Sequence, residues 1–340
     1  MTNPVTFRMR AVRIVVQLVL AAVLLACGCR GLIHAKKTFF RMDTVVHVTI
    51  VAPRGADLDT VWQGLDSLLE SWEQRFSPYH AASEVRALNE RTADSTRITP
   101  TLAAMLETGL AYGDTLDGGF DVTILPVKDV WGFGVPAGPK GIPSPQDLAA
   151  ALRRVDYQRV KVDREAGVAY FDDAGVVVDV GGVAKGYALR AAGRHLVRAG
   201  FDNWLVSAGG DILSRGKRHD NRPWRIGIQH PRDPDSLLTT VTLDSGSVVT
   251  SGDYERCWEK DGVRYHHIFD PRSGTCCRRN QSLTVWSMDP VEADIVSTGL
   301  FCRAYGDILA FVNARPRLAC VVVDSAGEMH ASRVWQDRMQ

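Results

Sequence analysis

Hydroxyls, carboxylates and imidazoles gather at the two ends of one stretch in the last third of the sequence. The first end reads Thr250-Ser251-Gly252-Asp253-Tyr254, and the second runs from His266 and His267 through Asp270-Pro271 to Gly274. Between them, Asp261-Gly262 is flanked by strand-forming residues, a pattern that strongly favours a β-hairpin. A hairpin places the two ends side by side and would make one wall of a catalytic site. The alternative is a polar edge hairpin with surface histidines.

A second group of residues that could take part in binding or catalysis follows a run of valines. Residues 176–180 read as a buried strand, which leads into Gly181-Gly182 and then into a helix that carries Lys185. Free backbone N–H groups and the positive end of a helix bind anions, so this turn predicts a pyrophosphate site. Neither a Walker A loop nor a dinucleotide fingerprint is present, because the residue after Gly186 is Tyr187 and the glycine spacing differs. The alternative is that the two glycines serve only a tight strand-to-helix turn.

The third group is Ala293-Asp294-Ile295-Val296-Ser297-Thr298. On a helix, Asp294 and Thr298 are four residues apart and share one face, so a carboxylate and a hydroxyl converge. Mg²⁺ prefers oxygen ligands and commonly shares its shell with substrate phosphates. The alternative is an ordinary capping or surface Asp with a Thr bonded to the preceding turn.

Two further places carry weaker signals. Asp121 and Thr123 lie among apolar residues after Gly118-Gly119-Phe120, and Tyr79 follows a helix that Pro78 interrupts. A tyrosine ring can stack on a planar ring system. Each of these also fits ordinary loop chemistry.

The elements that must position these groups favour an α+β fold. Apolar residues at helical spacing predict an amphipathic helix over residues 58–76, with further helices around 102–110, from Ser144-Pro145 to 154, and over 184–199. Residues 126–145 are rich in Gly and Pro and predict a long irregular loop. Runs of strands with few intervening helices favour α+β over a doubly wound sheet. The strands are expected at residues 45–51, 160–162, 168–171, 176–180, 204–208, 224–228, 241–243, 283–288 and 319–323.

The first thirty residues form a separate unit. Arg8, Arg10 and Arg13 precede an apolar run over residues 14–26, which is too short to span a membrane and predicts an export signal over residues 1–26. The signal leads into Cys27 as in a bacterial lipoprotein, with Cys29 as the second choice for lipidation and plain secretion as the alternative. Residues 27–37 are then expected to be a tether and residues 38–340 the folded domain.

Composition excludes some classes of partner. The chain has 340 residues, a net charge of +1 and 23% charged residues, and its Lys and Arg are spread and balanced by acids, so no nucleic-acid footprint is predicted. Beyond residue 30 the cysteines are Cys257, Cys276, Cys277, Cys302 and Cys320. No CxxC pair predicts zinc. Most are expected to be small core residues, with Cys257 and either Cys276 or Cys277 a weak disulfide candidate.

Taken together, these segments resemble the ApbE family of FAD:protein FMN transferases. The resemblance runs in order from Met42 to the end of the chain, with one departure: Asp43 stands where the family usually has Gly. The matching segments are Met42-Asp43-Thr44, Phe76-Ser77-Pro78-Tyr79, Ser83-Glu84, Leu88-Asn89, Gly118 to Thr123, Gly181 to Gly186, Gly209-Gly210-Asp211, Thr250 to Tyr254, His267 to Gly274 and Ala293 to Thr298.

The resemblance implies a fold and a set of site residues. The fold would be ApbE-like, or T-fold-like, with mixed or antiparallel sheets packed with helices in a single compact catalytic unit. FAD would lie with its ring system near Tyr79 and Met42 and its pyrophosphate near the Gly181-Gly182 turn. Further flavin contacts are implied for Gly119, Phe120, Asp121, Asp179, Lys185 and Ile268.

The same resemblance implies the metal and the catalytic groups. Mg²⁺ would be held by Asp294, Thr298 and the backbone carbonyl of Gly182, with Ser297 assisting. Asp294 would act in catalysis through the metal. His267 would lie beside the reacting phosphate and orient the acceptor hydroxyl or stabilise the transferred FMN, whereas His266 is expected to be structural.

The function implied is a Mg²⁺-dependent transferase that moves FMN from FAD to a threonine hydroxyl of an exported flavoprotein and releases AMP. The acceptor would be a subunit of a membrane redox complex, and a lipid anchor would hold the enzyme on the periplasm-facing surface of a bacterial membrane. Two alternatives remain open. One is an FAD pyrophosphatase that gives FMN and AMP, and the other is a flavin-binding or storage lipoprotein.

Overall fold

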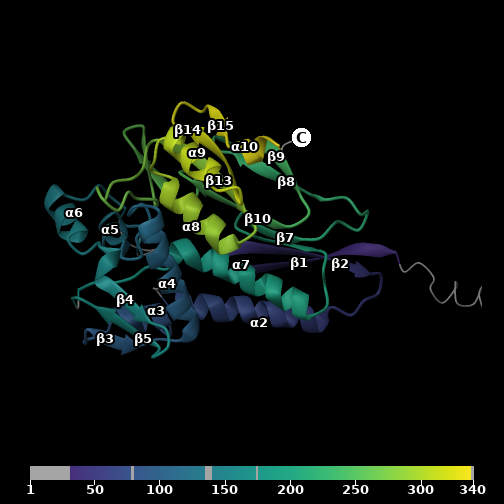
Figure 1. Cartoon of the computed structure of the whole chain (residues 1–340), viewed down its shortest axis with the longest axis horizontal. Helices are drawn as coiled ribbons and strands as arrows, with labels where there is room; N and C mark the ends of the chain where they lie inside the picture. The colour runs from purple at the N-terminus through teal and green to yellow at the C-terminus, as the bar shows by residue number, and fades with distance from the viewer. Residues whose placement is uncertain (1–30, 78–79, 135–139, 174, 338–340) are drawn as a thin grey trace, which may run out of the picture.

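An eight-stranded antiparallel sheet runs through the middle of the molecule (Figure 1). The computed structural model describes residues 31–77, 80–134, 140–173 and 175–337. In spatial order the strands are β1 (Leu32–Arg41), β2 (Thr44–Pro53), β6 (Trp204–Ala208), β7 (Asp211–Arg215), β10 (Gly246–Gly252), β13 (Asn280–Ser287), β14 (Leu318–Asp324) and β15 (Met329–Ala331).

Helices cover one face of this sheet, and a hairpin with a short helix covers the other. On the helical face, apolar residues of α7, α8 and α9 pack in one cluster with Val249 of β10 and Val322 of β14. Those of α2 and the rest of α7 pack in a second cluster with Val48 of β2. The neighbouring residues Val248 and Val321 point to the opposite face. Since both faces are covered, β13 is buried along its whole length, as expected for a strand without a solvent-facing side. The elements of the two layers are α2 (Asp59–Phe76), α7 (Gly181–Arg198), α8 (Pro290–Leu300) and α9 (Tyr305–Asn313) on one side, and β8 (Trp224–His230), β9 (Asp233–Leu243) and α10 (Arg333–Gln336) on the other.

A smaller layer flanks the amino-terminal half of α7, at the lower left of Figure 1. Here a three-stranded antiparallel sheet in the order β3-β5-β4 packs beside α3 and α4. The elements are α3 (Glu84–Asn89), β3 (Ser95–Arg97), α4 (Pro100–Thr115), the 3-10 turn Tyr157–Arg159, β4 (Val160–Asp163) and β5 (Val168–Phe171).

The predicted hairpin is present as β11 (Cys257–Lys260) and β12 (Val263–His266). Its turn residues Asp261 and Gly262 both have positive φ, at 53° and 73°, which is the geometry that two-residue hairpins require. Behind it, α5 (Leu125–Val130) and α6 (Pro145–Leu152) pack on the hairpin through a cluster that includes Trp131. Ser144 caps α6 as predicted, because its Oγ accepts the backbone N–H of Asp147 at 3.1 Å.

The α+β prediction is confirmed, and the helix over residues 58–76 and most strands lie where the sequence placed them. The tether over residues 27–37 is wrong in part, because β1 begins at Leu32 and pairs with β2 along its whole length. Lys36 and Lys37 made this segment look like a linker, yet lysines are common on edge strands, where they discourage pairing with another chain.

Two local predictions were also wrong. Residues 125–130 are helical and not part of an irregular loop; Pro126 stands in the first turn of α5, where a proline is tolerated. Residues 176–180 are buried but not a strand. Their backbone groups bond instead to a side chain and a loop: Asn89 exchanges two hydrogen bonds of 2.8 Å with Val178, and Asp179 donates to the carbonyl of Val122 at 2.6 Å.

The disulfide prediction was wrong as well. Cys277 pairs with Cys302, and Cys257, Cys276 and Cys320 are free. The bridge fastens the segment that follows the β11–β12 hairpin to the segment that follows α8. Cys276 is buried and donates from Sγ to the carbonyl of His266 at 3.2 Å.

Candidate active site

A cleft of about 470 Å³ opens where the amino-terminal end of α7, the middle of α8, strand β10 and the loop after β12 meet. It collects the residues predicted from widely separated motifs. The predicted residues that line it are Met42, Gly119, Phe120, Asp121, Asp179, Gly182, Lys185, His267, Ile268, Asp294 and Thr298.

The first wall of the cleft is the start of α7. Gly181 and Gly182 are the first two helical residues, and Gly181 donates its backbone N–H to Oδ1 of Asp179 at 2.7 Å. A Cβ on Gly182 would lie 2.8 Å from the ring of Phe120, so glycine is needed for the close approach of helix and ring. The N–H of Gly181 is bonded to Asp179, and those of Val183 and Ala184 are bonded to the carbonyl of Val180, so among the described residues the N–H of Gly182 is the one at this helix start that is left for an anion.

Asp179 is held in place by a cation that sequence reasoning missed. Its carboxylate is 4% exposed and forms an ion pair with Lys128 of α5. Burial opposes the charge on Asp179, but Lys128 and the N–H of Gly181 outweigh burial, and the pKa of Asp179 is lowered. The pair thus keeps a buried carboxylate ionised directly beneath the phosphate-binding turn. No local sequence pattern links these two residues, because they are 51 positions apart and only the fold brings them together.

Lys185 is likewise paired and not a free cation. It forms an ion pair with Asp211, the first residue of β7, and Asp211 also accepts the backbone N–H of Thr250 at 3.2 Å. Burial works against the charge on Lys185, yet Asp211, then Asp294 and Glu255, raise its pKa above the ordinary value. Lys185 therefore neutralises a group of carboxylates at the centre of the site.

The second wall is α8, which carries the predicted metal ligands on one face as expected. Asp294 is 2% exposed, and its Oδ2 accepts the backbone N–H of Gly186 at 2.9 Å. Burial raises the pKa of Asp294, Asp211 adds to this effect and Lys185 opposes it. Thr298 Oγ1 lies 3.4 Å from the hydroxyl of Ser251 on β10. A carboxylate and hydroxyl oxygens thus converge near the Gly182 turn.

Ser297 stands apart from this group. It is fully buried and does not line the cleft; its hydroxyl donates to the carbonyl of Asp294 at 3.0 Å and lies 3.0 Å from the hydroxyl of Ser251. The structure therefore places it behind the ligand face, where it supports Ser251 and Asp294.

The donor set fits Mg²⁺. Asp294 supplies a carboxylate, Thr298 and Ser251 supply hydroxyls, and the start of α7 supplies backbone oxygen, all hard ligands. The buried Asp294, whose pKa is raised without a cation, is a group whose ionised form a divalent cation would stabilise.

His267 reaches the cleft from the loop after β12. Its Nδ1 is buried and has no hydrogen-bond partner among the described residues, while the residue itself lines the cleft. Burial, then the charges of Arg256 and Lys128, hold the pKa of His267 well below 6.5, and the ring is neutral at physiological pH. His266 is buried and engaged on both ring nitrogens, by the carbonyl of Cys277 at 2.6 Å and the N–H of Ile268 at 3.3 Å.

The third wall is apolar. Trp72 and Phe76 of α2 line the cleft together with Met42 and Phe120, and the rings of Trp72 and Phe76 lie 4.7 Å apart. Trp72 was visible in the sequence only as part of the apolar face of a helix. Tyr79, the residue predicted to stack on the flavin, lies outside the described residues. The aromatic wall offers a surface on which a planar ring system can pack.

Asp121 lines the cleft, but both of its carboxylate oxygens already accept hydrogen bonds from the surrounding loops. Its Oδ1 accepts the backbone N–H and the hydroxyl of Thr123 at 2.7 and 2.6 Å, and its Oδ2 accepts the N–H of Tyr157 at 3.1 Å. Burial raises the pKa of Asp121. Both oxygens thus organise the loop that places Phe120 against Gly182.

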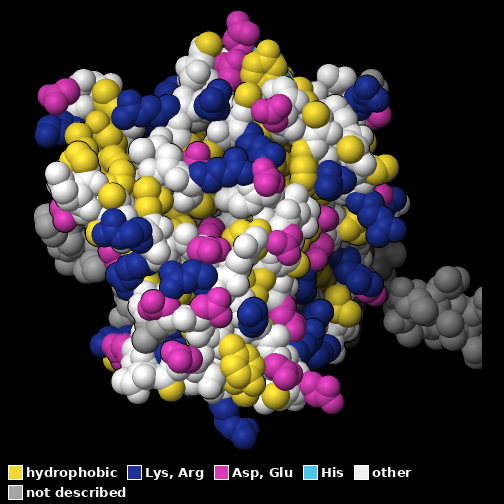
Figure 2. Space-filling model, turned by 60° about the vertical axis from the view of Figure 1, so that its left-hand side comes forward, with side chains coloured by type: hydrophobic (Ala, Val, Ile, Leu, Met, Phe, Trp, Pro, Cys, Tyr) yellow, Lys and Arg dark blue, Asp and Glu magenta, His cyan; other side chains and the backbone are white. Residues whose placement is uncertain are grey.

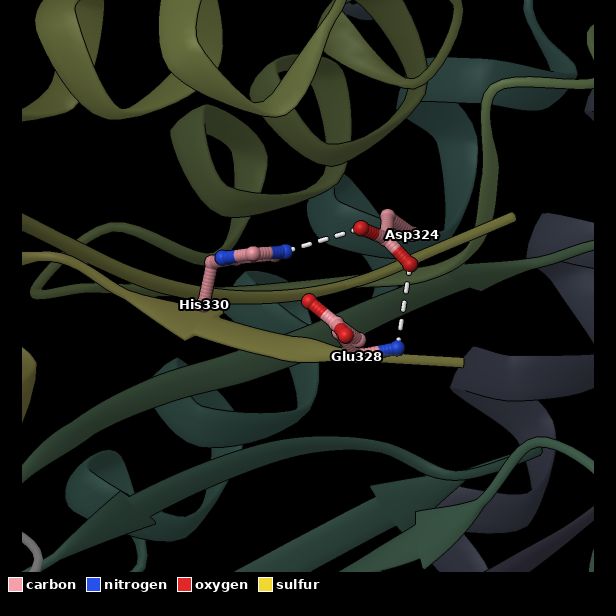
Figure 3. Close-up of side chains that lie close together, drawn as sticks. All are labelled: Asp324, Glu328 and His330. Atoms are coloured by element: carbon pink, nitrogen blue, oxygen red, sulfur yellow. Dashed lines mark hydrogen bonds and ion pairs between the residues drawn. The ribbon is translucent and has the colours of Figure 1, made fainter. Parts of the chain in front are cut away.

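One cluster with metal-ligand chemistry lies away from the cleft. Asp324, Glu328 and His330, at the β14–β15 hairpin, are the one group of three His, Cys, Asp or Glu in the described ranges with ligand atoms within 4.8 Å of one another (Figure 3). Asp324 accepts the N–H groups of Ala326 and Glu328 at 2.9 and 3.0 Å and pairs with His330 at 2.9 Å. These contacts are those of a hairpin turn, and β14 and β15 contribute nothing to the cleft.

Comparison with known proteins identifies the family of this chain. The ApbE family profile matches residues 42–322. An FAD:protein FMN transferase of Vibrio cholerae serotype O1 is 31% identical over 92% of this chain and 95% of its own length. One from Salmonella typhimurium is 32% identical over 76% of this chain and 75% of its own.

The fold is shared with solved structures of the same class. The ApbE protein of Thermotoga maritima superposes with a TM-score of 0.85 at 27% identity, covering 91% of this chain and all of its own. The flavin transferase ApbE of Vibrio cholerae gives a TM-score of 0.82 at 26% identity, covering 90% and 99%. The fold is thus that of the flavin-transferring class. The chain belongs to the ApbE family.

Proposed function

We propose that this chain transfers FMN from FAD to a threonine hydroxyl of an acceptor protein, with Mg²⁺ as cofactor and AMP as the second product. It is a flavinyltransferase of the FAD:protein FMN transferase class. The observation that carries the proposal is the meeting, in one cleft, of the Gly182 turn, the Asp294–Thr298 face and His267. Each was expected to serve a different part of a phosphoryl-transfer site, and they come from three separate parts of the chain.

The proposed reaction transfers the FMN phosphoryl group from AMP to the acceptor hydroxyl. The acceptor hydroxyl oxygen forms a bond to the FMN phosphorus, the bond from that phosphorus to the bridging oxygen breaks, AMP leaves with the bridging oxygen, and the hydroxyl proton is released to solvent. Bound Mg²⁺, held by Asp294, Thr298 and the Gly182 carbonyl, would supply charge stabilisation on the pyrophosphate.

The residues of the chain do the remaining work. The backbone N–H of Gly182 at the start of α7 binds a phosphate oxygen, and the Lys128–Asp179 pair fixes that turn. His267, kept neutral by its surroundings, accepts a hydrogen bond from the acceptor hydroxyl and orients it toward phosphorus. Trp72 and Phe76 pack against the flavin ring on the apolar wall.

The cellular setting is part of the same proposal. Residues 1–26 act as an export signal, Cys27 carries the lipid, and the enzyme faces the periplasm of a bacterium while it modifies a subunit of a membrane redox complex. The support is in the sequence, and Cys27 and Cys29 lie outside the described residues. Among the residues that the structure describes, no helix is long and apolar enough to cross a membrane.

Product analysis tests the proposal. The chain is incubated with FAD, with and without Mg²⁺, and with and without a threonine-bearing acceptor protein, and the nucleotides are separated. AMP together with covalently fluorescent acceptor supports the transferase. Free FMN with AMP in the presence of acceptor would identify a pyrophosphatase, and unchanged FAD a binding protein. Turnover that persists after chelation would refute the metal assignment.

A further inference from the structure

A second, wider groove of about 1050 Å³ lies along the carboxyl-terminal half of α7, between that helix and the ends of β6 and β7. The cleft uses Gly181 to Lys185 at the other end of the same helix. From Lys185 to Arg198 the helix rises roughly 20 Å at 1.5 Å per residue. The groove and the active site are therefore separate features at opposite ends of α7.

The groove carries an excess of positive charge. Arg190, Arg194 and Arg198 follow one another at four-residue spacing on α7, which places them along one face of the helix, and Arg215 and Lys217 line the groove as well. Against these five cations stand two lining carboxylates, Asp289 and Asp202, which leaves an excess of three positive charges.

The two carboxylates are already used within the fold. Arg190 is paired with Asp289, and Arg215 with Asp202 at 3.1 Å. Within the described ranges the side chains of Arg194, Arg198 and Lys217 make no hydrogen bond or ion pair. By contrast, Lys and Arg are interspersed with Asp and Glu on the side of the molecule brought forward in Figure 2.

Apolar side chains accompany the free cations. Met288 and Val197 line the groove and are 58% and 39% exposed. Cations beside exposed apolar groups suit a surface of phosphate headgroups above acyl chains, because both components find partners there.

The groove is lined by the carboxyl-terminal half of α7, and that end of the helix lies on the side of the molecule where β1 begins (Figure 1). His34, near the start of β1, is paired in register with Val51, whose N–H donates to the carbonyl of Asn203 at 2.8 Å. The side chain of Asn203 in turn accepts the N–H of Lys217 at 2.6 Å. Asn203 and Lys217 both line the groove. Its rim is thus connected to the first residues of β1.

The tether is too short to separate this rim from a membrane that holds the lipid. Cys27 and Leu32 are five positions apart, and five residues span at most about 17 Å when fully extended. Lipidation at Cys29 would shorten the reach further. A basic patch close to an anionic membrane surface adds to the binding that a lipid anchor provides.

We propose that the groove formed by Arg194, Arg198 and Lys217 binds the headgroup phosphates of anionic phospholipids in the membrane that holds the anchor. The groove adds an electrostatic contact to the lipid anchor, and it turns the cleft at the other end of α7 away from the lipid, toward an acceptor. The proposal rests on the proposed membrane anchoring, and it goes beyond the flavin transfer itself.

Vesicle binding of the full chain tests this. Partitioning onto neutral phosphatidylcholine vesicles reports the amino-terminal segment alone. Adding roughly 30% phosphatidylglycerol should strengthen partitioning at least about tenfold, since each cation near an anionic surface contributes about a factor of five. The gain should shrink as salt rises from about 0.1 to about 0.5 M.

Two matched triple variants test whether the groove itself binds the anionic lipid. The variant Arg194→Glu/Arg198→Glu/Lys217→Glu should lose the stronger partitioning onto anionic vesicles. It should keep its binding to neutral vesicles and its FAD turnover in detergent. Arg97→Glu/Lys161→Glu/Arg317→Glu changes the same net charge at exposed positions outside the groove and should keep the gain. Equal losses in the two variants, or no gain for the unmodified chain, would overturn the proposal.

Two further outcomes separate the neighbouring explanations. Loss of binding to neutral vesicles would count against the anchor and not against the groove. If the groove variant binds anionic vesicles normally but flavinylates an acceptor protein poorly in detergent, the groove receives an acidic protein partner, and the lipid proposal is wrong.

Discussion

Oδ2 of Asp294 on α8 accepts the backbone N–H of Gly186 on α7 at 2.9 Å. This one bond fastens the predicted metal ligand to the helix whose first turn is the predicted phosphate site. The two helices approach closely at this point: a Cβ on Gly186 would lie 2.7 Å from the carbonyl oxygen of Pro290 and 2.7 Å from Cα of Val291. The spacing between Asp294 and the first turn of α7 is thus fixed by a helix contact.

Replacing Asp294 with Asn should separate its structural role from its chemical one. The amide oxygen can still accept from Gly186, so folding is retained, and the free energy of unfolding should change by less than about 1 kcal/mol because a costly buried charge is removed. Mg²⁺ binding by calorimetry and AMP release should both be lost, while FAD binding persists in part. Normal AMP release from a folded variant would contradict the assignment of Asp294.

Gly186→Ala tests the helix contact itself. The added methyl group meets backbone on α8, which cannot move aside as a side chain can, so we expect a loss of about 1–3 kcal/mol in unfolding free energy and weakened Mg²⁺ affinity. Gly306→Ala on α9 is the control, because nothing lies within 4 Å of its Cβ position. Denaturant titration of the two variants makes the comparison, and equal stabilities would refute the close contact.

Asp43→Gly should stabilise the protein and change the cleft. Asp43 has φ 55° in the two-residue turn between β1 and β2, a conformation that suits the glycine usual in the family and costs other residues up to about 1–2 kcal/mol. We expect a gain of about 0.5–1 kcal/mol in unfolding free energy.

Asp43 also lines the cleft, so removing its carboxylate should favour the anionic FAD by about 1 kcal/mol or less. Asn221→Gly is the control: Asn221 has φ 60° but does not line the cleft, and this variant should gain stability without a change in FAD affinity. A fall in FAD affinity for Asp43→Gly would show that the carboxylate assists binding.

His267 should make stability depend on pH in a defined direction. Its pKa is held well below 6.5 in the fold, so between the folded and unfolded pKa values the unfolded chain binds more protons. Its stabilising contribution is therefore complete above about pH 6.5 and falls as pH drops below that value, by about 1.4 kcal/mol per pH unit at most.

Denaturant unfolding of the unmodified chain and His267→Gln measures this difference. Between about pH 7.5 and pH 5.5 the unmodified chain should lose about 1.4 kcal/mol more than the variant, in which that titration is absent. The same variant should lower flavin transfer more than FAD binding. Parallel pH curves would mean that His267 is not shielded in the fold.

The sequence by itself determined the features that depend on neighbouring residues. The Asp261-Gly262 turn, the amphipathic α2 and the shared face of Asp294 and Thr298 follow from backbone preferences and helical period within a few residues. The order of the motifs indicated the resemblance to the family. The flavin, metal and catalytic residues that this resemblance implied line one cleft, except that Ser297 lies behind the cleft and Tyr79 lies outside the described residues.

Only the tertiary structure decided the partners that lie far apart in the chain. Lys128 with Asp179, Lys185 with Asp211 and Cys277 with Cys302 are pairs that no local pattern marks. Residues 176–180 have the composition of a strand, yet Asn89 and Val122 supply their hydrogen-bond partners. The physical reason is common to all of these. Local preference is weak compared with the free energy of burying and pairing a polar group, and which groups meet is known only once the layers have packed.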